Sequence, residues 1–153
     1  MSVLVVGVGN RLRRDDGVGP EAADRVRAAR PEVDVAEVNG DASRLLDLWA
    51  GRAHVVLVDA VRTGAPPGVC HLWRLRAGEW GDAEPSSLVS SHLVGVVDAI
   101  DLGRALGRVP ETLDVVGVEV LDLGSGAGLS DPVAAGLGVV VDRVLELLGP
   151  RAP

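Results

Sequence analysis

The stretch SVLVVGVGNRLRRDDGVGPEAADRV, residues 2–26, has the pattern of a strand, a glycine-rich loop and a helix in succession. Residues 2–6 are apolar and mostly β-branched with no polar alternation, which predicts a strand covered on both faces. The glycines between positions 7 and 19 predict a loop. Pro20 is suited to the first helical position, and Glu21 to the first turn. This order is typical of α/β proteins.

The alternation of strands and helices continues along the chain. Asp41 is a suitable N-cap for a second helix, Ser90 or Ser91 for a third, and Asp131-Pro132 opens a last one. We therefore predict a three-layer α/β/α sandwich around a mostly parallel five-stranded sheet. Neither an internal repeat nor a linker is visible, so residues 1–153 are expected to form a single domain. The later strands are predicted over residues 33–38, 54–58, 69–75 and 113–120.

The composition excludes several classes of protein. With 47% hydrophobic and 24% charged residues, the chain is expected to be globular, and a net charge of -7 argues against binding nucleic acid. Arg11, Arg13 and Arg14 form a small basic cluster, which suits either an anionic partner surface or a solvated loop. The single Cys70 favours a reducing compartment. Since no signal peptide or membrane span is evident, we expect a cytoplasmic protein, and a monomer.

Ligand sites in such sheets form beyond the carboxyl ends of the strands, which selects the loops after the first, third and fifth strands. Gly7-Val8-Gly9 begins like a dinucleotide-binding motif, but Leu12 stands where the third glycine is required. We therefore do not expect a nucleotide site in the first loop.

The same loops carry candidate ligands for a metal ion. Asp15 and Asp16 precede a helix, where one carboxylate can cap the turn and leave the other available. Asp59 ends the third predicted strand, as either a structural or a functional carboxylate. His92 stands at a predicted helix start, which favours the neutral imidazole that metals bind. Two carboxylates and one imidazole suit a divalent ion such as zinc or nickel.

Other reactive side chains are less well placed. His54 opens a strand at the amino end and His71 lies within a strand, so both are expected to be structural. Ser125 lacks the glycines that a nucleophile elbow requires two residues away on each side, since Leu123 and Ala127 stand there, and Cys70 is expected to be a small buried hydrophobe. The paired histidines of zinc proteases, His-x-x-x-His on a helix, are absent from the sequence.

Taken together, these residues resemble the hydrogenase maturation endopeptidases. The resemblance rests on four motifs in order, covering nearly the whole chain: GVGNRLRRDDGVGP at 7–20, VLVDAVRTGAPPGVCHLW at 56–73, SSHLVGVVDAIDLGRALG at 90–107 and VGVEVLDLGSGAGLSDPV at 116–133. The chain departs from the family pattern at Val69, where threonine is usual, and at Val120, where many members have proline. Both changes are expected to affect which precursor is accepted.

The resemblance implies an endopeptidase that removes the C-terminal extension of a NiFe hydrogenase large-subunit precursor after nickel insertion. It assigns the metal-contacting, catalytic positions to Asp16, Asp59 and His92. The nickel would be carried by the substrate, so the free enzyme need not hold a metal. Two alternatives remain: a non-proteolytic nickel-sensing or chaperone module, and a germination-type peptidase with another protein substrate.

Overall fold

The computed structural model describes residues 2–76 and 94–151, with only the backbone of residues 94 and 95. A five-stranded sheet in the order β2-β1-β3-β5-β4 forms its centre. All neighbouring strands are parallel except β4, which runs antiparallel to β5. The elements are β1 (Val3–Val8), a 3-10 helix (Arg14–Gly17), α1 (Val18–Ala29), β2 (Asp34–Val38), α2 (Ala42–Trp49), β3 (His54–Val61), β4 (Cys70–Arg76), α3 (Val94–Leu106), β5 (Thr112–Glu119) and α4 (Asp131–Leu148).

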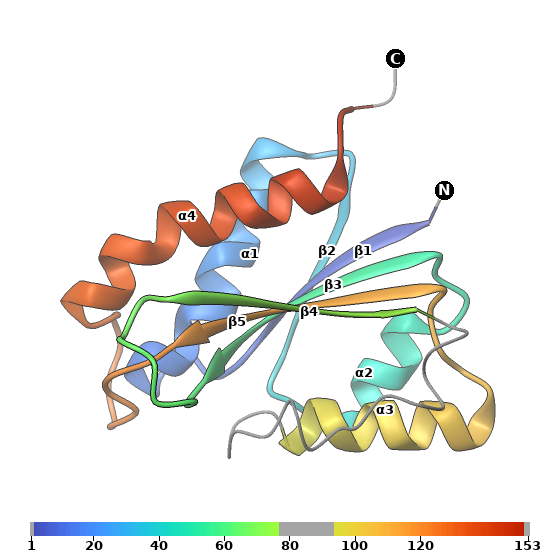
Figure 1. Cartoon of the computed structure of the whole chain (residues 1–153), viewed down its shortest axis with the longest axis horizontal. Coiled ribbons are helices and arrows are strands. Elements are labelled where there is room, and N and C mark those ends of the chain that lie inside the picture. The colour runs from blue at the N-terminus through green and yellow to red at the C-terminus, as the bar shows by residue number, and fades with distance from the viewer. Residues whose placement is uncertain (1, 77–93, 152–153) are drawn as a thin grey trace.

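Helices cover both faces of the sheet (Figure 1). α1 and α4 pack on one face, and α2 and α3 pack on the other. Each layer has its own apolar core, built mainly from valine and leucine. The helix residues of these cores are Val18, Ala22, Val26, Val133, Leu137, Val140, Val141 and Val144 on the first face, and Leu45, Leu46, Trp49, Val96, Ala99 and Ile100 on the second.

The strand order places a switch point between β1 and β3. The chain leaves β1 through α1 on one face and enters β3 from α2 on the other, so the two connections diverge. In doubly wound sheets a crevice forms at the carboxyl ends of the two strands where the connections part. The loop after β1 and the carboxyl half of β3 are therefore the positions at which a site is expected.

Two glycines allow α1 to abut the sheet directly. A Cβ on Gly19 would lie 2.4 Å from the carbonyl oxygen of Val58 and 2.5 Å from that of Val8. A Cβ on Gly7 would lie 2.5 Å from the carbonyl oxygen of Gly19. Real Cβ atoms essentially never come so close to backbone, so both positions require glycine. Gly7, which begins the stretch that resembled a nucleotide motif, therefore serves helix–strand packing together with Gly19.

The structure confirms the predicted α/β fold with a mostly parallel sheet of five strands. Asp41 caps α2, its carboxylate accepting the N–H of Ser43 at 2.9 Å. The larger differences in boundaries are that β1 continues to Val8, where a loop was predicted from position 7, that α1 begins at Val18 rather than Pro20, and that β3 continues past Asp59 to Val61. The 3-10 helix that leads into α1 starts the helical backbone earlier, and pairing with β5 extends β3. The predicted caps Ser90 and Ser91 lie outside the described residues.

Within the part of the chain that the structure describes, no helix is long and apolar enough to cross a membrane.

The contact between α1 and the sheet gives a direct test of the fold. We expect Gly19→Ala to destabilise the protein by about 2 kcal/mol or more, because backbone atoms must move to admit the methyl group. A Cβ on Gly138 in α4 would meet no atom within 4 Å beyond its own helical turn, so Gly138→Ala should stabilise by up to about 1 kcal/mol. Urea unfolding monitored by circular dichroism measures both changes. Equal stability of the two variants would contradict this description of the α1 contact.

Candidate active site

Asp59 lies at the switch point, on the sheet face that α2 and α3 cover. It follows Val58, the last β3 residue paired with β1, and it stands opposite Gly117 of β5. Leu57 and Val61, two residues before and after Asp59, belong to the core under α2 and α3. Because side chains two residues apart in a strand share a face, the Asp59 side chain lies on this face of the sheet as well. Asp59 is 1% exposed. The site therefore contains a carboxylate that is almost completely withdrawn from solvent.

The two carboxylate oxygens of Asp59 are not equally satisfied. Oδ1 accepts the N–H of Ala60 at 2.8 Å. Oδ2 is buried and, among the described residues, has no hydrogen-bond partner. A buried polar atom without a partner is rare in native proteins and is unfavourable for stability. Such an atom is a candidate ligand for a group that is bound from outside.

Asp16 is the second carboxylate of the site. It lies in the 3-10 helix that precedes α1 and is 7% exposed. Its Oδ2 accepts the N–H of Asn10 at 2.8 Å. Gly9 permits this tight loop, because a Cβ there would lie 1.9 Å from the carbonyl oxygen of Asp16. The loop after β1 therefore folds back so that Asp16, near its end, lies against Gly9 and Asn10 at its start.

Asp16 and Asp59 are electrostatically coupled. Burial raises the pKa of Asp59 well above its ordinary value, and the negative charge of Asp16 raises it further. The single backbone hydrogen bond from Ala60 opposes this shift without cancelling it. The protein alone thus favours the protonated form of Asp59, whereas a cation between the two carboxylates would favour the ionised form.

Asp15 has a different role from its neighbour. Its carboxylate accepts the backbone N–H groups of Leu121, Asp122 and Ser130 at 2.9, 2.9 and 2.6 Å, and the Ser130 hydroxyl at 2.7 Å. Burial alone would raise the pKa of Asp15, but these hydrogen bonds outweigh burial and lower it. Asp15 therefore ties the loop after β1 to the loop after β5. Asp15 thus has the structural role that the sequence allowed for one of the two aspartates.

The third predicted ligand, His92, lies outside the described residues. α3 begins at Val94 and runs in the direction opposite to β5 (Figure 1). Within residues 2–76 and 94–151, no group of three His, Cys, Asp or Glu side chains is placed to hold a metal ion. The contribution of His92 to the site remains a prediction.

His71 is closer to this site than the sequence analysis expected. Because β4 is antiparallel, it begins at the edge where the parallel strands end, and His71 pairs with Gly117, the residue that also pairs with Asp59. The expectation that His71 lies away from this edge was wrong. Its Nε2 lies 2.9 Å from Oε1 of Glu119, which is 2% exposed and also accepts the N–H of Thr63 at 3.1 Å.

A similar pair lies at the opposite edge of the sheet. His54 Nε2 lies 2.7 Å from Oδ2 of Asp114, whose other oxygen accepts Nε–H of Arg74 at 2.7 Å. This agrees with the expected structural role of His54 at the amino end of its strand. Glu119 and Asp114 were not singled out in the sequence. Each is an acidic residue in an otherwise apolar strand. In a sequence, this pattern indicates a buried carboxylate that is paired with another side chain.

Comparison with known proteins identifies the class. The chain matches the family model described as hydrogenase maturation protease over residues 21–147, and it belongs to that family. The matched range includes positions 59 and 92 and begins after Asp16. The protein is therefore a hydrogenase maturation endopeptidase.

Individual relatives resemble nearly the whole chain. The hydrogenase 2 maturation protease of Escherichia coli is 29% identical over 152 residues, covering 97% of this chain and 91% of that protein. The structure of the hydrogenase maturating endopeptidase HybD from Escherichia coli has a TM-score of 0.76 at 27% identity, with 97% and 92% coverage. The NiFe hydrogenase maturation protease HybD from Thermococcus kodakarensis also has a TM-score of 0.76 at 27% identity, with 96% and 99% coverage.

The unusual environment of Asp59 leads to a prediction about stability. We expect Asp59→Asn to stabilise the protein at neutral pH by about 1–3 kcal/mol, because it removes a buried carboxylate that lacks a partner. A raised pKa means that the wild-type carboxyl group contributes most when protonated at low pH and loses that contribution as the pH rises. The advantage of Asp59→Asn should therefore shrink as the pH falls. Thermal unfolding across a pH series measures it.

Asp15→Asn is the matched control. The lowered pKa of Asp15 reflects stabilising hydrogen bonds to its ionised form, so this variant should be less stable than wild type at neutral pH. The same sign of change for both variants would contradict the distinct roles given to these two aspartates.

Proposed function

We propose that this protease removes the C-terminal extension of a NiFe hydrogenase large-subunit precursor once nickel has been inserted. In this proposal Asp16, Asp59 and His92 engage the nickel that the precursor carries. The observation that carries the proposal is the Oδ2 atom of Asp59, which is buried beside Asp16 without a hydrogen-bond partner among the described residues. Membership of the hydrogenase maturation proteases supports this choice of substrate class.

The chemistry of the carboxylates fits a divalent cation. Two neighbouring buried carboxylates repel each other, and a divalent ion between them removes that repulsion while giving Asp59 Oδ2 a partner. Carboxylate oxygens and an imidazole nitrogen are ligands that nickel and zinc both accept. Ion binding would replace the proton that burial favours on Asp59. A metal-loaded precursor would thus relieve the unfavourable environment that the ionised Asp59 has in the free protein.

This arrangement suggests how processing would depend on nickel. Contact between the site and the nickel would fix the precursor so that its scissile peptide bond lies against the carboxyl edge of the sheet. The metal ion would then polarise the attacking water or the scissile carbonyl group. Water adds its oxygen to the carbonyl carbon, the carbon–nitrogen bond breaks, and the amine nitrogen takes up a proton. The products are the shortened subunit and the free extension.

Family membership favours this function over the two alternatives. A nickel-sensing or chaperone module would bind the precursor without shortening it, and a germination-type peptidase would cleave another protein without a nickel requirement. Val69 and Val120, where the chain departs from the family pattern, both lie beside Glu119 at the edge of the site. Glu119 donates its backbone N–H to the carbonyl oxygen of Val69 at 2.9 Å. These two positions are candidates for client selection.

The proposal is tested by mixing the protein with the large-subunit precursor, with and without inserted nickel, and following the precursor's size on a gel. Only the nickel-loaded form should be shortened. Asp16→Ala, Asp59→Asn and His92→Ala should each lower the processing rate by about 100-fold or more, because each removes a ligand of the substrate metal. The controls His54→Gln, at the opposite sheet edge, and Asp47→Asn, on an exposed part of α2, should process at the wild-type rate.

Equal shortening of nickel-free and nickel-loaded precursor would contradict the metal requirement. Binding without shortening by the wild-type protein would favour the non-proteolytic alternative.

A further inference from the structure

Two large apolar side chains are exposed at the carboxyl edge of the sheet. Leu12, in the loop after β1, is 69% exposed, and Leu121, just after β5, is 55% exposed. The loops that carry them are tied together. The N–H of Gly126 donates to the carbonyl oxygen of Leu12 at 2.9 Å, and the N–H of Leu121 donates to Asp15 at 2.9 Å. Both leucines therefore lie on hydrogen-bonded loops at one edge of the sheet, and one of these loops carries Asp15 and Asp16.

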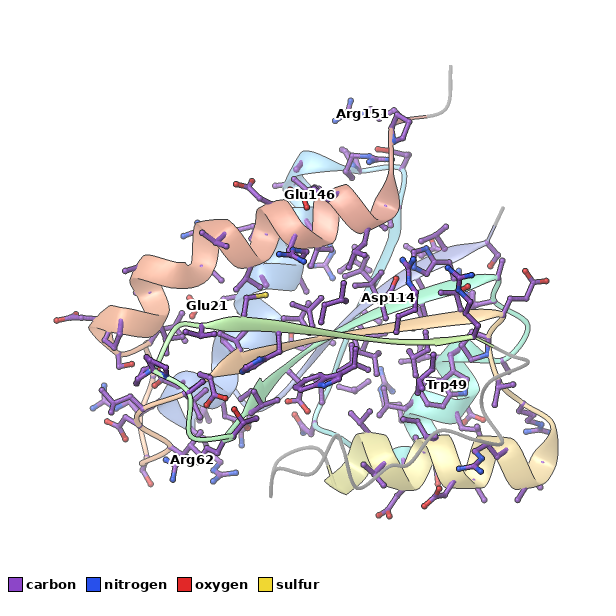
Figure 2. The ribbon with its side chains drawn as sticks, viewed as in Figure 1. Glu21, Trp49, Arg62, Asp114, Glu146 and Arg151 are labelled. Atoms are coloured by element: carbon purple, nitrogen blue, oxygen red, sulfur yellow. The ribbon has the colours of Figure 1, made fainter. Side chains whose placement is uncertain are left out.

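Three exposed arginines share this edge. Arg13 forms a backbone bridge with Gly126, Arg14 donates Nη1–H to the carbonyl oxygen of Ala127 at 3.1 Å, and Arg62 donates Nη2–H to that of Leu121 at 3.4 Å. Figure 2 shows Arg62 at the same end of the molecule as Glu21, away from Asp114.

In the described part of the chain, none of Arg13, Arg14 and Arg62 forms an ion pair, which is also true of the exposed Arg25 and Arg44. Arg11, by contrast, pairs with Asp24 and Glu37, and Arg52 pairs with Asp34. The acid Asp122 lies on the same edge, but its Oδ1 accepts the N–H of Gly124 at 2.8 Å. Exposed arginines without ion pairs therefore lie around the acidic residues of this edge, on a chain whose net charge is -7.

We propose that Leu12, Leu121, Arg13, Arg14 and Arg62 form the surface on which the large-subunit precursor docks. This docking edge would receive an apolar patch of the precursor that is bordered by acidic side chains. The inference rests on the proposed function, since it gives that function its partner surface. It follows from position: Asp59 is 1% exposed and Asp16 is 7% exposed, so a protein that presents a metal ion to them must contact the loops around them.

The two kinds of side chain have different consequences for binding. Exposed leucines lose contact with water when the partner covers them, which slows dissociation of the complex. Arginines without ion pairs attract an acidic partner over longer distances, which speeds association and makes it sensitive to salt. A recess of about 200 Å³ beside this edge, lined in part by Arg11, Arg14 and Glu21, gives room for a protruding side chain of the partner.

The test compares leucines of similar exposure at different places. Leu106, at the end of α3 and 55% exposed, is the control for Leu121. We expect Leu12→Asp and Leu121→Asp to lower kcat/KM for the nickel-loaded precursor by about tenfold or more, mainly by raising KM. Leu106→Asp should process as wild type. Melting temperatures of all three variants should stay near that of wild type, because the side chains are exposed.

The arginines are tested by their salt dependence. Binding of the nickel-loaded precursor to wild type, measured by surface plasmon resonance, should weaken as salt is raised. The double variant Arg13→Gln with Arg62→Gln should associate more slowly at low salt and depend less on salt. Arg44→Gln, on exposed α2, serves as the control and should behave as wild type.

Binding and cleavage are measured separately so that the two proposals can fail separately. Wild-type precursor affinity in both leucine variants would overturn the docking edge, even if wild type cleaves normally. Self-association of the free protein that disappears in Leu12→Asp would also overturn it, in favour of a contact between two copies of this chain. Precursor binding that requires the leucines, without cleavage by wild type, would support the docking edge and contradict the proposed function.

Discussion

The approach of α1 to the sheet constrains the rest of the site. Gly19 places the start of the helix against the carbonyl oxygens of Val8 and Val58, so the helix begins at the point where β1 and β3 part. The chain between β1 and α1 must then fold back within a few residues. Gly9 permits this turn, because any side chain at this position would collide with the backbone of Asp16. As a result, the carboxylate of Asp16 lies near enough to Asp59 to raise its pKa.

Three aspartates at this edge of the sheet have distinct environments. Asp15 is saturated with hydrogen bonds and joins two loops. Asp59 is equally withdrawn from solvent but keeps a buried oxygen without a described partner, beside the charge of Asp16. Proteins commonly retain such unfavourable arrangements where a ligand is needed. In our account, that ligand is the metal ion presented by the precursor, and the exposed leucines and arginines around the carboxylates receive the protein that carries it.

The sequence predicted the fold well, because apolar runs alternating with helical patterns leave little choice of architecture. It also selected Asp16 and Asp59, from loop position and family resemblance. It could not separate Asp15 from Asp16, because the donors to Asp15 come from the distant loop at Leu121 to Ser130. It misplaced His71, because nothing in a short alternating run reveals that its strand is antiparallel. His92 stays a prediction, supported by its motif and not by a described contact.

The central claim is that Asp16 and Asp59 become ligands of the nickel in the precursor. It is tested most directly by nickel X-ray absorption on the nickel-loaded precursor, alone and frozen with the protein during the first turnover. Our account predicts that wild type adds light-atom ligands to the nickel and that Asp59→Asn reduces this change. An unchanged nickel spectrum with wild type, in a sample that goes on to be cleaved when thawed, would contradict it.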